Sequence, residues 1–150
     1  MLQPYLCDSV FLDLFSGSGA IGIEALSRGA KKAVFIEQQD EAIRCINDNL
    51  ENTRLKEQAL VKKTDVITGL QQLEGTGVQF DVVFMDPPYS CNLEKMALKY
   101  LKNSELIHQD TLLIFEAALD TDVSDLEDMG YEIHKIKKYK TNMHVFLYRT

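Results

Sequence analysis

The sequence predicts an α/β fold, a doubly wound and mostly parallel sheet of about seven strands that ends in an antiparallel hairpin. Short apolar runs alternate with helical patterns along most of the chain, and a glycine-rich turn joins the first run to the first helix. Right-handed crossovers between such alternating elements make neighbouring strands parallel. Two strand-like runs close the chain without room for a helix between them, which predicts the hairpin.

The expected strands are short and bounded by polar residues or by glycine and proline. Five of them are apolar enough to be buried parallel strands: residues 10–14, 33–37, 59–63, 80–85 and 112–116. The last two, over residues 131–139 and 143–149, should pair with each other. Between the strands, helical spacing predicts helices over residues 20–28, 41–51, 66–73, 93–101 and 124–129. Asp40 and Asn92 are expected to cap the second and fourth of these helices.

The composition is that of one globular domain. The 150 residues are 45% hydrophobic and 26% charged, enough to bury a core without disulfide or metal, and we expect one domain over residues 1–150. A net charge of −7 means that a nucleic-acid partner would need a local basic patch. Three cysteines and three histidines without ligand spacing predict a reducing cytoplasm and no metal site. The first residues have no secretory signal and no apolar run could span a bilayer, so we expect no membrane partner.

The turn after the first strand has the features of a nucleoside-cofactor site. Gly17, Gly19 and Gly22 satisfy GxGxxG between a strand and a helix, so the backbone and the helix N-terminus can approach a ligand. Glu37 ends the second strand 20 residues after Gly17, where a carboxylate can accept from both ribose hydroxyls. This pattern is compatible with NAD, with S-adenosylmethionine (SAM), or with glycines that serve packing only.

Several side chains on the same turns are candidate cofactor contacts. Asp13 ends the first strand, where methyltransferases of this fold commonly carry an acidic residue near the methionine part of SAM; alternatively, it caps loop N–H groups. Asp65 follows the third strand and could accept from an adenine amino group, cap the next helix, or do both. Phe15 is expected to pack in the core or beneath the cofactor. The remaining candidates are Ser16, Ser18, Gln38 and Val66.

The motif Asp86-Pro87-Pro88-Tyr89, after the fourth strand, decides the chemistry. Consecutive prolines stiffen the backbone and remove two N–H donors, which leaves the Asp86 carboxylate and the proline carbonyls as acceptors. Two acceptors can hold the hydrogens of a planar substrate's exocyclic amine and direct its lone pair at an electrophilic methyl group. Tyr89 adds a flat face on which an extruded base can stack. The alternative interpretation is an ordinary turn with a packed tyrosine.

These ordered motifs resemble the SAM-dependent amino-methyltransferases, and residues 12–30 (LDLFSGSGAIGIEALSRGA) are similar to the signature of the RsmD-like family. Members usually read DLFAGSG, where this chain has Ser16 in place of alanine. The resemblance covers nearly the whole chain. It implies a Rossmann-like SAM-dependent enzyme that methylates the N2 amine of a guanine in small-subunit (16S) ribosomal RNA. Its catalytic residues would be Asp86, Pro87, Pro88 and Tyr89, with Asp86 also beside the cofactor.

The resemblance also implies a partner, which is ribosomal RNA or a small-subunit assembly particle. The family normally carries a basic RNA-contacting extension before the first strand, and we expect that extension to be absent from this sequence, which starts close to that strand. Four lysines crowd the expected hairpin and could contact phosphates or form a solvated face: Lys135, Lys137, Lys138 and Lys140. The oligomeric state is not predicted.

Three other functions use the same motifs. Adenine N6 in DNA or RNA, or a protein glutamine, offers a similar amine to the acceptor loop. An NAD-dependent oxidoreductase would use the glycine turn and Glu37, but it leaves the Asp86–Tyr89 motif without a purpose. A non-catalytic RNA-binding or assembly module could keep the fold and lose the chemistry.

Overall fold

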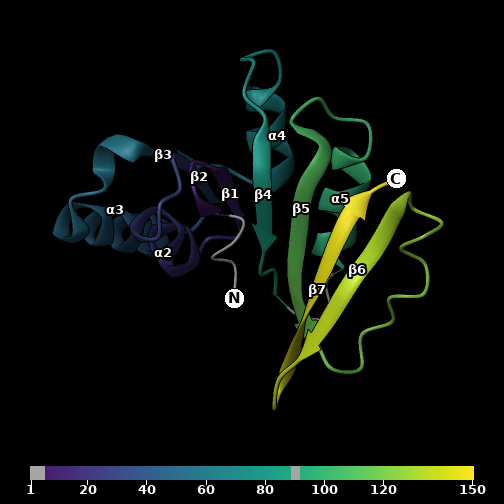
Figure 1. Cartoon of the computed structure of the whole chain (residues 1–150). Helices are drawn as coiled ribbons and strands as arrows, with labels where there is room; N and C mark the ends of the chain where they lie inside the picture. Colours follow the sequence, from purple (N-terminus) through teal and green to yellow (C-terminus); the bar gives the residue numbers. More distant parts are fainter. Residues whose placement is uncertain (1–5, 89–91) are drawn as a thin grey trace.

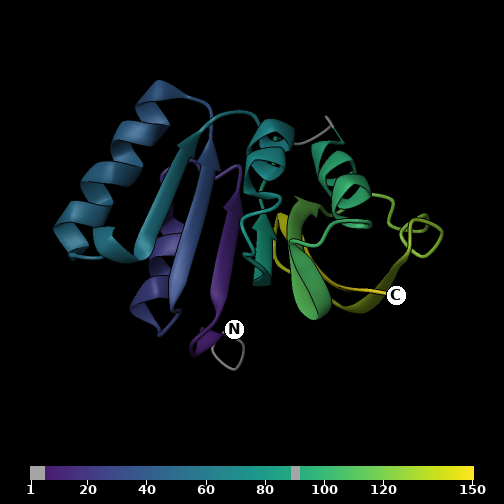
Figure 2. The same ribbon diagram turned by 90° about the horizontal axis from the view of Figure 1, so that it is seen from above.

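The computed structural model describes residues 6–88 and 92–150, which form one twisted sheet covered by helices (Figures 1 and 2). The strands are β1 (Val10–Leu14), β2 (Lys32–Glu37), β3 (Ala59–Lys63), β4 (Phe80–Met85), β5 (Ile107–Ala118), β6 (Tyr131–Lys138) and β7 (Asn142–Arg149). The helices are α2 (Ala20–Ser27), α3 (Asp40–Thr53), the 3-10 turn η1 (Lys56–Gln58), α4 (Val66–Leu73) and α5 (Leu93–Leu101).

The strand order is β3-β2-β1-β4-β5-β7-β6. Strands β1 to β5 are parallel to one another, whereas β7 is antiparallel to both β5 and β6. The order reverses direction at β1, so β1 and β4 flank the switch point at which ligands of doubly wound sheets bind. The predicted parallel sheet with a C-terminal antiparallel hairpin is therefore confirmed.

Two apolar layers hold the sheet, one on each face. Successive residues of β1 point to opposite faces: Leu12 packs with the side chains of α4 and α5, whereas Phe11 packs with those of α2 and α3. Both side chains are fully buried. Because helices cover both faces, the central strands are apolar almost throughout, as the sequence indicated.

Some local predictions were wrong. Residues 124–129 form turns rather than a helix, because six residues are too few to sustain a helix without strong tertiary packing. Asp40 is the first residue of α3 and pairs with Lys63 instead of capping. Asn92 precedes α5 as expected, but its side chain makes no capping hydrogen bond. Strand β5 begins at Ile107, before the predicted start, because a register shift along β4 accommodates the polar residues that follow Ile107.

The carboxyl ends of β1 to β5 meet at one edge of the sheet, and the hairpin also reaches that edge. Glu116 of β5 pairs with His144 of β7, which places the start of β7 beside the end of β5. Figure 1 shows that the turn between β6 and β7 projects past the ends of β4 and β5. Loops from five parallel strands and one hairpin therefore surround this edge.

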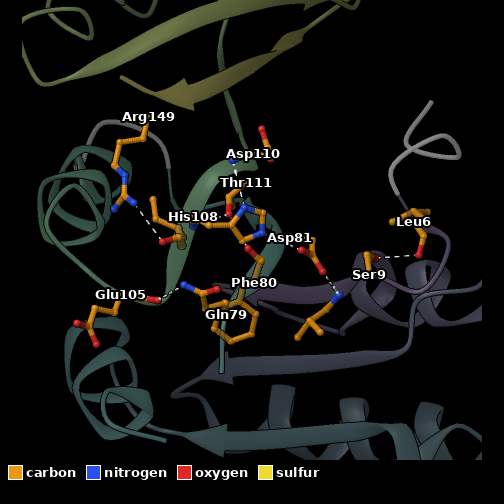
Figure 3. Close-up of polar contacts among 12 residues, drawn as sticks. Leu6, Ser9, Gln79, Phe80, Asp81, Glu105, His108, Asp110, Thr111 and Arg149 are labelled. Carbon is orange, nitrogen blue, oxygen red and sulfur yellow. Dashed lines mark hydrogen bonds and ion pairs between the residues drawn. The ribbon is translucent and has the colours of Figure 1, made fainter. Parts of the chain in front are cut away.

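A polar network fastens the opposite edge, where β4 and β5 begin (Figure 3). The Asp81 carboxylate accepts from the backbone N–H of Val10 at 2.9 Å and lies 2.8 Å from His108 Nε2. The Arg149 guanidinium donates to the carbonyls of Leu101, Lys102, Ser104 and Ile107. These partners all belong to the fold, so the network has a structural role. Within residues 6–88 and 92–150, no helix is long and apolar enough to cross a membrane.

Candidate active site

A cavity of about 510 Å³ opens at the carboxyl edge of the sheet, between the ends of β1, β2, β3 and β4. Its volume lies in the range of small-molecule sites. It is lined by nine residues that the sequence predicts as cofactor-binding or catalytic candidates: Phe15, Gly17, Glu37, Gln38, Asp65, Val66, Asp86, Pro87 and Pro88. The fold therefore brings together residues that are far apart in the sequence.

The glycine turn is shaped by left-handed backbone conformations. Gly17 and Gly19 have φ angles of 57° and 78°, and Phe15 has a φ of 59°, which is uncommon for a residue with a side chain. A Cβ on Gly17 would meet no atom within 4 Å, whereas one on Gly19 would lie 3.0 Å from Ile46. Gly17 thus leaves open space toward the cavity, and Gly19 permits close packing of α2 on α3. Phe15 lines the cavity and also packs against the core, as one of its two expected roles requires.

The Glu37 carboxylate closes the turn against the end of β2. One oxygen accepts from the Gly17 N–H at 2.9 Å, and the other accepts from the N–H groups of Gln38 and Gln39, each at 2.9 Å. A carboxylate offers about four acceptor positions. Glu37 therefore retains acceptor capacity on the cavity wall while it fixes the turn.

Four other expected cofactor contacts lie behind the turn rather than in the cavity wall. The Asp13 side chain accepts from the Gly22 N–H at 3.1 Å, as the capping interpretation requires, and is 2% exposed. This burial raises the pKa of the Asp13 carboxyl well above its ordinary value. The Ser16 hydroxyl donates to the Asp13 carbonyl at 2.6 Å, and the Ser18 carbonyl accepts from Asn49. Together with Gly19, these residues support the turn from outside the cavity.

Asp65 caps a helix, as expected, and also lines the cavity. Its side chain caps α4 by accepting from the Thr68 N–H at 3.1 Å. The Thr68 side chain and this backbone N–H together lower the pKa of the carboxyl. The residue also lines the cavity beside Val66. The cap orients the carboxylate, and its remaining acceptor positions are available to a ligand.

The loop after β4 forms the wall opposite the glycine turn. Asp86 and Pro88 are exposed and Pro87 is buried. Partial burial and the nearby Glu116 carboxyl raise the pKa of Asp86 to about 6. The fourth residue of the motif, Tyr89, lies outside the described residues.

Sequence reasoning missed several residues of the site. The cavity wall also contains Ile36, Gln39, Thr64 and Leu93. Glu116 belongs to a predicted strand end, a position that could have marked it, since ligands bind at the carboxyl ends of strands. His144 carried no such signal, because only the pairing of β7 with β5 brings its Nε2 to 3.1 Å from Glu116 Oε1. Among the described residues, no group of three histidine, cysteine or acidic side chains could hold a metal ion.

Residues 1–149 match the model of the family described as conserved hypothetical protein 95. The chain belongs to this family. One relative, ribosomal RNA small subunit methyltransferase D of Haemophilus influenzae, is 37% identical over 79% of this chain and 62% of that protein. The protein of the same name in Escherichia coli K12 is 28% identical over 91% of this chain and 66% of that protein. The chain thus spans less than two thirds of the length of these two relatives.

The crystal structure of a candidate methylase from Haemophilus influenzae has the same fold. It matches with a TM-score of 0.84 and 32% identity, over 99% of this chain and 91% of that chain. The relatives named methyltransferase D confirm the resemblance to the RsmD-like family that residues 12–30 indicated. The structural match confirms the methyltransferase type of sheet.

Proposed function

We propose that this chain is a SAM-dependent methyltransferase whose target is the exocyclic N2 amine of a guanine in small-subunit ribosomal RNA. The proposal is carried by one observation: a single cavity is lined by Gly17 and Glu37 and by Asp86, Pro87 and Pro88. An acceptor-rich loop thus faces a nucleoside-type site. The names of the methyltransferase D relatives support ribosomal RNA as the substrate.

The cavity residues fit SAM as cofactor. The open space at Gly17 admits close approach of a ligand to the backbone, and the Glu37 carboxylate has room for the ribose hydroxyls. Gln38 and Asp65 line the neighbouring wall and offer acceptors for an adenine amino group. Asp13 acts indirectly, because its carboxylate is buried against α2 and fixes the helix that follows the turn.

Bound SAM supplies an electrophilic methyl group. The protein's part is to make a weak nucleophile reactive, since the lone pair of a base amine is delocalised into the ring. The Asp86 carboxylate and the proline carbonyls accept the amine hydrogens, which fixes the nitrogen and turns its lone pair out of the base plane. As the nitrogen is methylated it loses a proton, and Asp86, with a pKa of about 6, can accept that proton.

Mass spectrometry of nucleosides tests the proposed function. The chain is incubated with unmodified small-subunit ribosomal RNA and SAM that carries a deuterated methyl group, and the RNA is then digested. We expect one labelled product, N2-methylguanosine. Label in N6-methyladenosine would show that the target amine is adenine N6. Label in protein alone would show that the target is a protein side chain. Absence of label in RNA and protein, with NADH bound more tightly than S-adenosylhomocysteine (SAH), would favour the oxidoreductase.

A further inference from the structure

Glu116 and Asp86 form a pair of carboxyl groups across the ends of β5 and β4. The Glu116 carboxyl lies close enough to Asp86 to raise the pKa of Asp86. Two carboxylates this close repel each other when both are ionised. A ligand that brings several N–H donors to this point would therefore satisfy both groups at once.

His144 holds Glu116 from the neighbouring strand. Its Nε2 lies 3.1 Å from Glu116 Oε1, and its side chain is only 12% exposed. The Phe84 and Tyr139 rings contact the imidazole edge-on, at centroid distances of 5.7 and 4.9 Å. The His144 Nδ1 is buried without a hydrogen-bond partner in the described part of the chain. The Nε2–H tautomer of the imidazole can therefore donate to the Glu116 carboxylate and needs no acceptor at Nδ1.

A second hollow, of about 210 Å³, adjoins the cofactor cavity. Pro87 and Pro88 line both spaces, and Glu116 and Asn92 also line the smaller one. The hollow is smaller than the roughly 300–1,000 Å³ of sites for whole drug-sized ligands, and it suits one flat ring system. A base placed there would present its edge to Glu116 with its amine beside Asp86.

We propose that Glu116, positioned by His144, recognises the ring N1–H of guanine beside the target amine and thereby selects guanine. This inference rests on the proposed function. Guanine alone among the RNA bases carries a ring N–H next to its exocyclic amine; adenine and cytosine carry a ring acceptor there. The Glu116 carboxylate can accept from N1–H, which leaves the two N2–H groups for Asp86 and the proline carbonyls. An acceptor facing Glu116 would instead be repelled.

The test uses 2-aminopurine, which keeps the N2 amine of guanine but has an unprotonated N1. Short RNAs carrying guanine or 2-aminopurine at the mapped target position are compared in single-turnover methyl transfer. The wild-type chain is expected to prefer guanine. Glu116→Gln places an amide that can donate to the unprotonated N1 of 2-aminopurine or accept from the N1–H of guanine, so its preference for guanine over 2-aminopurine should fall by roughly tenfold to a hundredfold. Its affinity for SAH should stay within about threefold of the wild type, since Glu116 is not among the cofactor-cavity residues.

Control variants separate this role from general effects of charge and packing. Asp128→Asn removes an exposed carboxylate that lines neither the hollow nor the cofactor cavity, and it should leave the base preference unchanged. His144→Leu should slow transfer to guanine because it frees the Glu116 side chain. His144→Gln should restore part of the rate, because its amide can still donate to Glu116. Equal rates for these two His144 variants would contradict the positioning role.

The outcomes distinguish this inference from the proposed function. If the wild type methylates guanine N2 and Glu116→Gln keeps the wild-type preference, the inference is overturned and the proposed function stands. Loss of transfer to both RNAs in Glu116→Gln, with SAH affinity intact, would assign Glu116 to the amine alone and would also overturn base selection. If the wild type methylates no guanine, the proposed function itself is contradicted.

Discussion

At the scale of single residues, the site depends on carboxylates whose surroundings set different tasks. Asp13 is buried and accepts a hydrogen bond from the Gly22 N–H of α2, whereas Glu37 and Asp65 accept from backbone N–H groups at the cavity wall. Partial burial and the nearby Glu116 carboxyl raise the pKa of Asp86 to about 6. We therefore propose that the same side-chain chemistry supports a helix at Asp13, binds the cofactor at Glu37 and Asp65, and recognises the amine at Asp86.

The raised pKa of Asp86 implies a pH dependence of methyl transfer. The ionised carboxylate is the acceptor, so the rate should fall as pH drops through about 6, approaching tenfold per pH unit below that value. Above this pKa the group is ionised and should contribute no further change. Single-turnover rates from pH 5 to 8 check this expectation. Asp86→Asn, whose amide oxygen accepts at any pH, should abolish the dependence; a profile unchanged in that variant would assign it to another group.

Removal of the Glu37 carboxylate should weaken both cofactor binding and the fold. Glu37→Ala loses the acceptor for two ribose hydroxyls, and each such hydrogen bond contributes about 1.5–3 kcal/mol, so SAH affinity should fall at least tenfold. The backbone donors at Gly17, Gln38 and Gln39 also lose their acceptor, which should lower the free energy of unfolding by about 1–3 kcal/mol.

Calorimetric titration with SAH and urea denaturation measure these two effects of Glu37→Ala separately. Glu37→Gln, which retains one acceptor oxygen, should give intermediate values in both measurements. Wild-type SAH affinity combined with a destabilised fold would restrict Glu37 to its structural contacts.

At the scale of elements, the β6–β7 hairpin is the part that can compensate for the acidic net charge. Lys138 pairs with Met143, which in turn pairs with Ala117 at the end of β5, so the basic end of the hairpin lies at the site edge. Lys137 also lies over the Tyr139 ring, 5.6 Å from its centroid. A cationic and aromatic surface beside the site suits a nucleic-acid backbone.

Neutralising the hairpin should weaken RNA binding and leave the cofactor site intact. In the test variant, Lys137, Lys138 and Lys140 are changed to glutamine. Each lost phosphate contact should reduce the magnitude of the slope of log affinity against log salt concentration by roughly 0.7–0.9, so the total reduction should be about two. SAH affinity should not change. The same change at Lys31 and Lys32, exposed at the opposite edge of the sheet, is the control. If both variants behave alike, the hairpin is only a solvated face.

The elements were predictable where local pattern and tertiary context agree. Apolar runs predicted β1, β2 and β4 most clearly, because strands covered on both faces must be apolar. Asp65 was recognised as a cap because capping is local. The start of β5 was hidden, since its polar residues after Ile107 are accommodated by a register shift rather than by burial. The pair of Glu116 and His144 arises from strand pairing between residues 28 positions apart, and no local pattern reports such pairing.

At the scale of the whole molecule, the loops at the carboxyl ends of the strands form two halves of the site. The turns after β1, β2 and β3 form the half suited to a cofactor, and the loop after β4 with the end of β5 forms the half suited to an amine. The halves meet at the switch point of the strand order, between β1 and β4. Cofactor binding and methyl transfer should therefore be separable by mutation.

The measurement that tests this account most directly compares SAH affinity and single-turnover methyl transfer in the wild type and in Asp86→Ala. The variant removes one acceptor for the amine and leaves Gly17, Glu37 and Asp65 unchanged. We expect SAH affinity within a few-fold of the wild type and a methyl-transfer rate lower by about 10²–10³, the usual effect of losing one preorganised hydrogen-bond partner. Transfer to RNA at the wild-type rate by Asp86→Ala would contradict the assignment of this loop as the catalytic site.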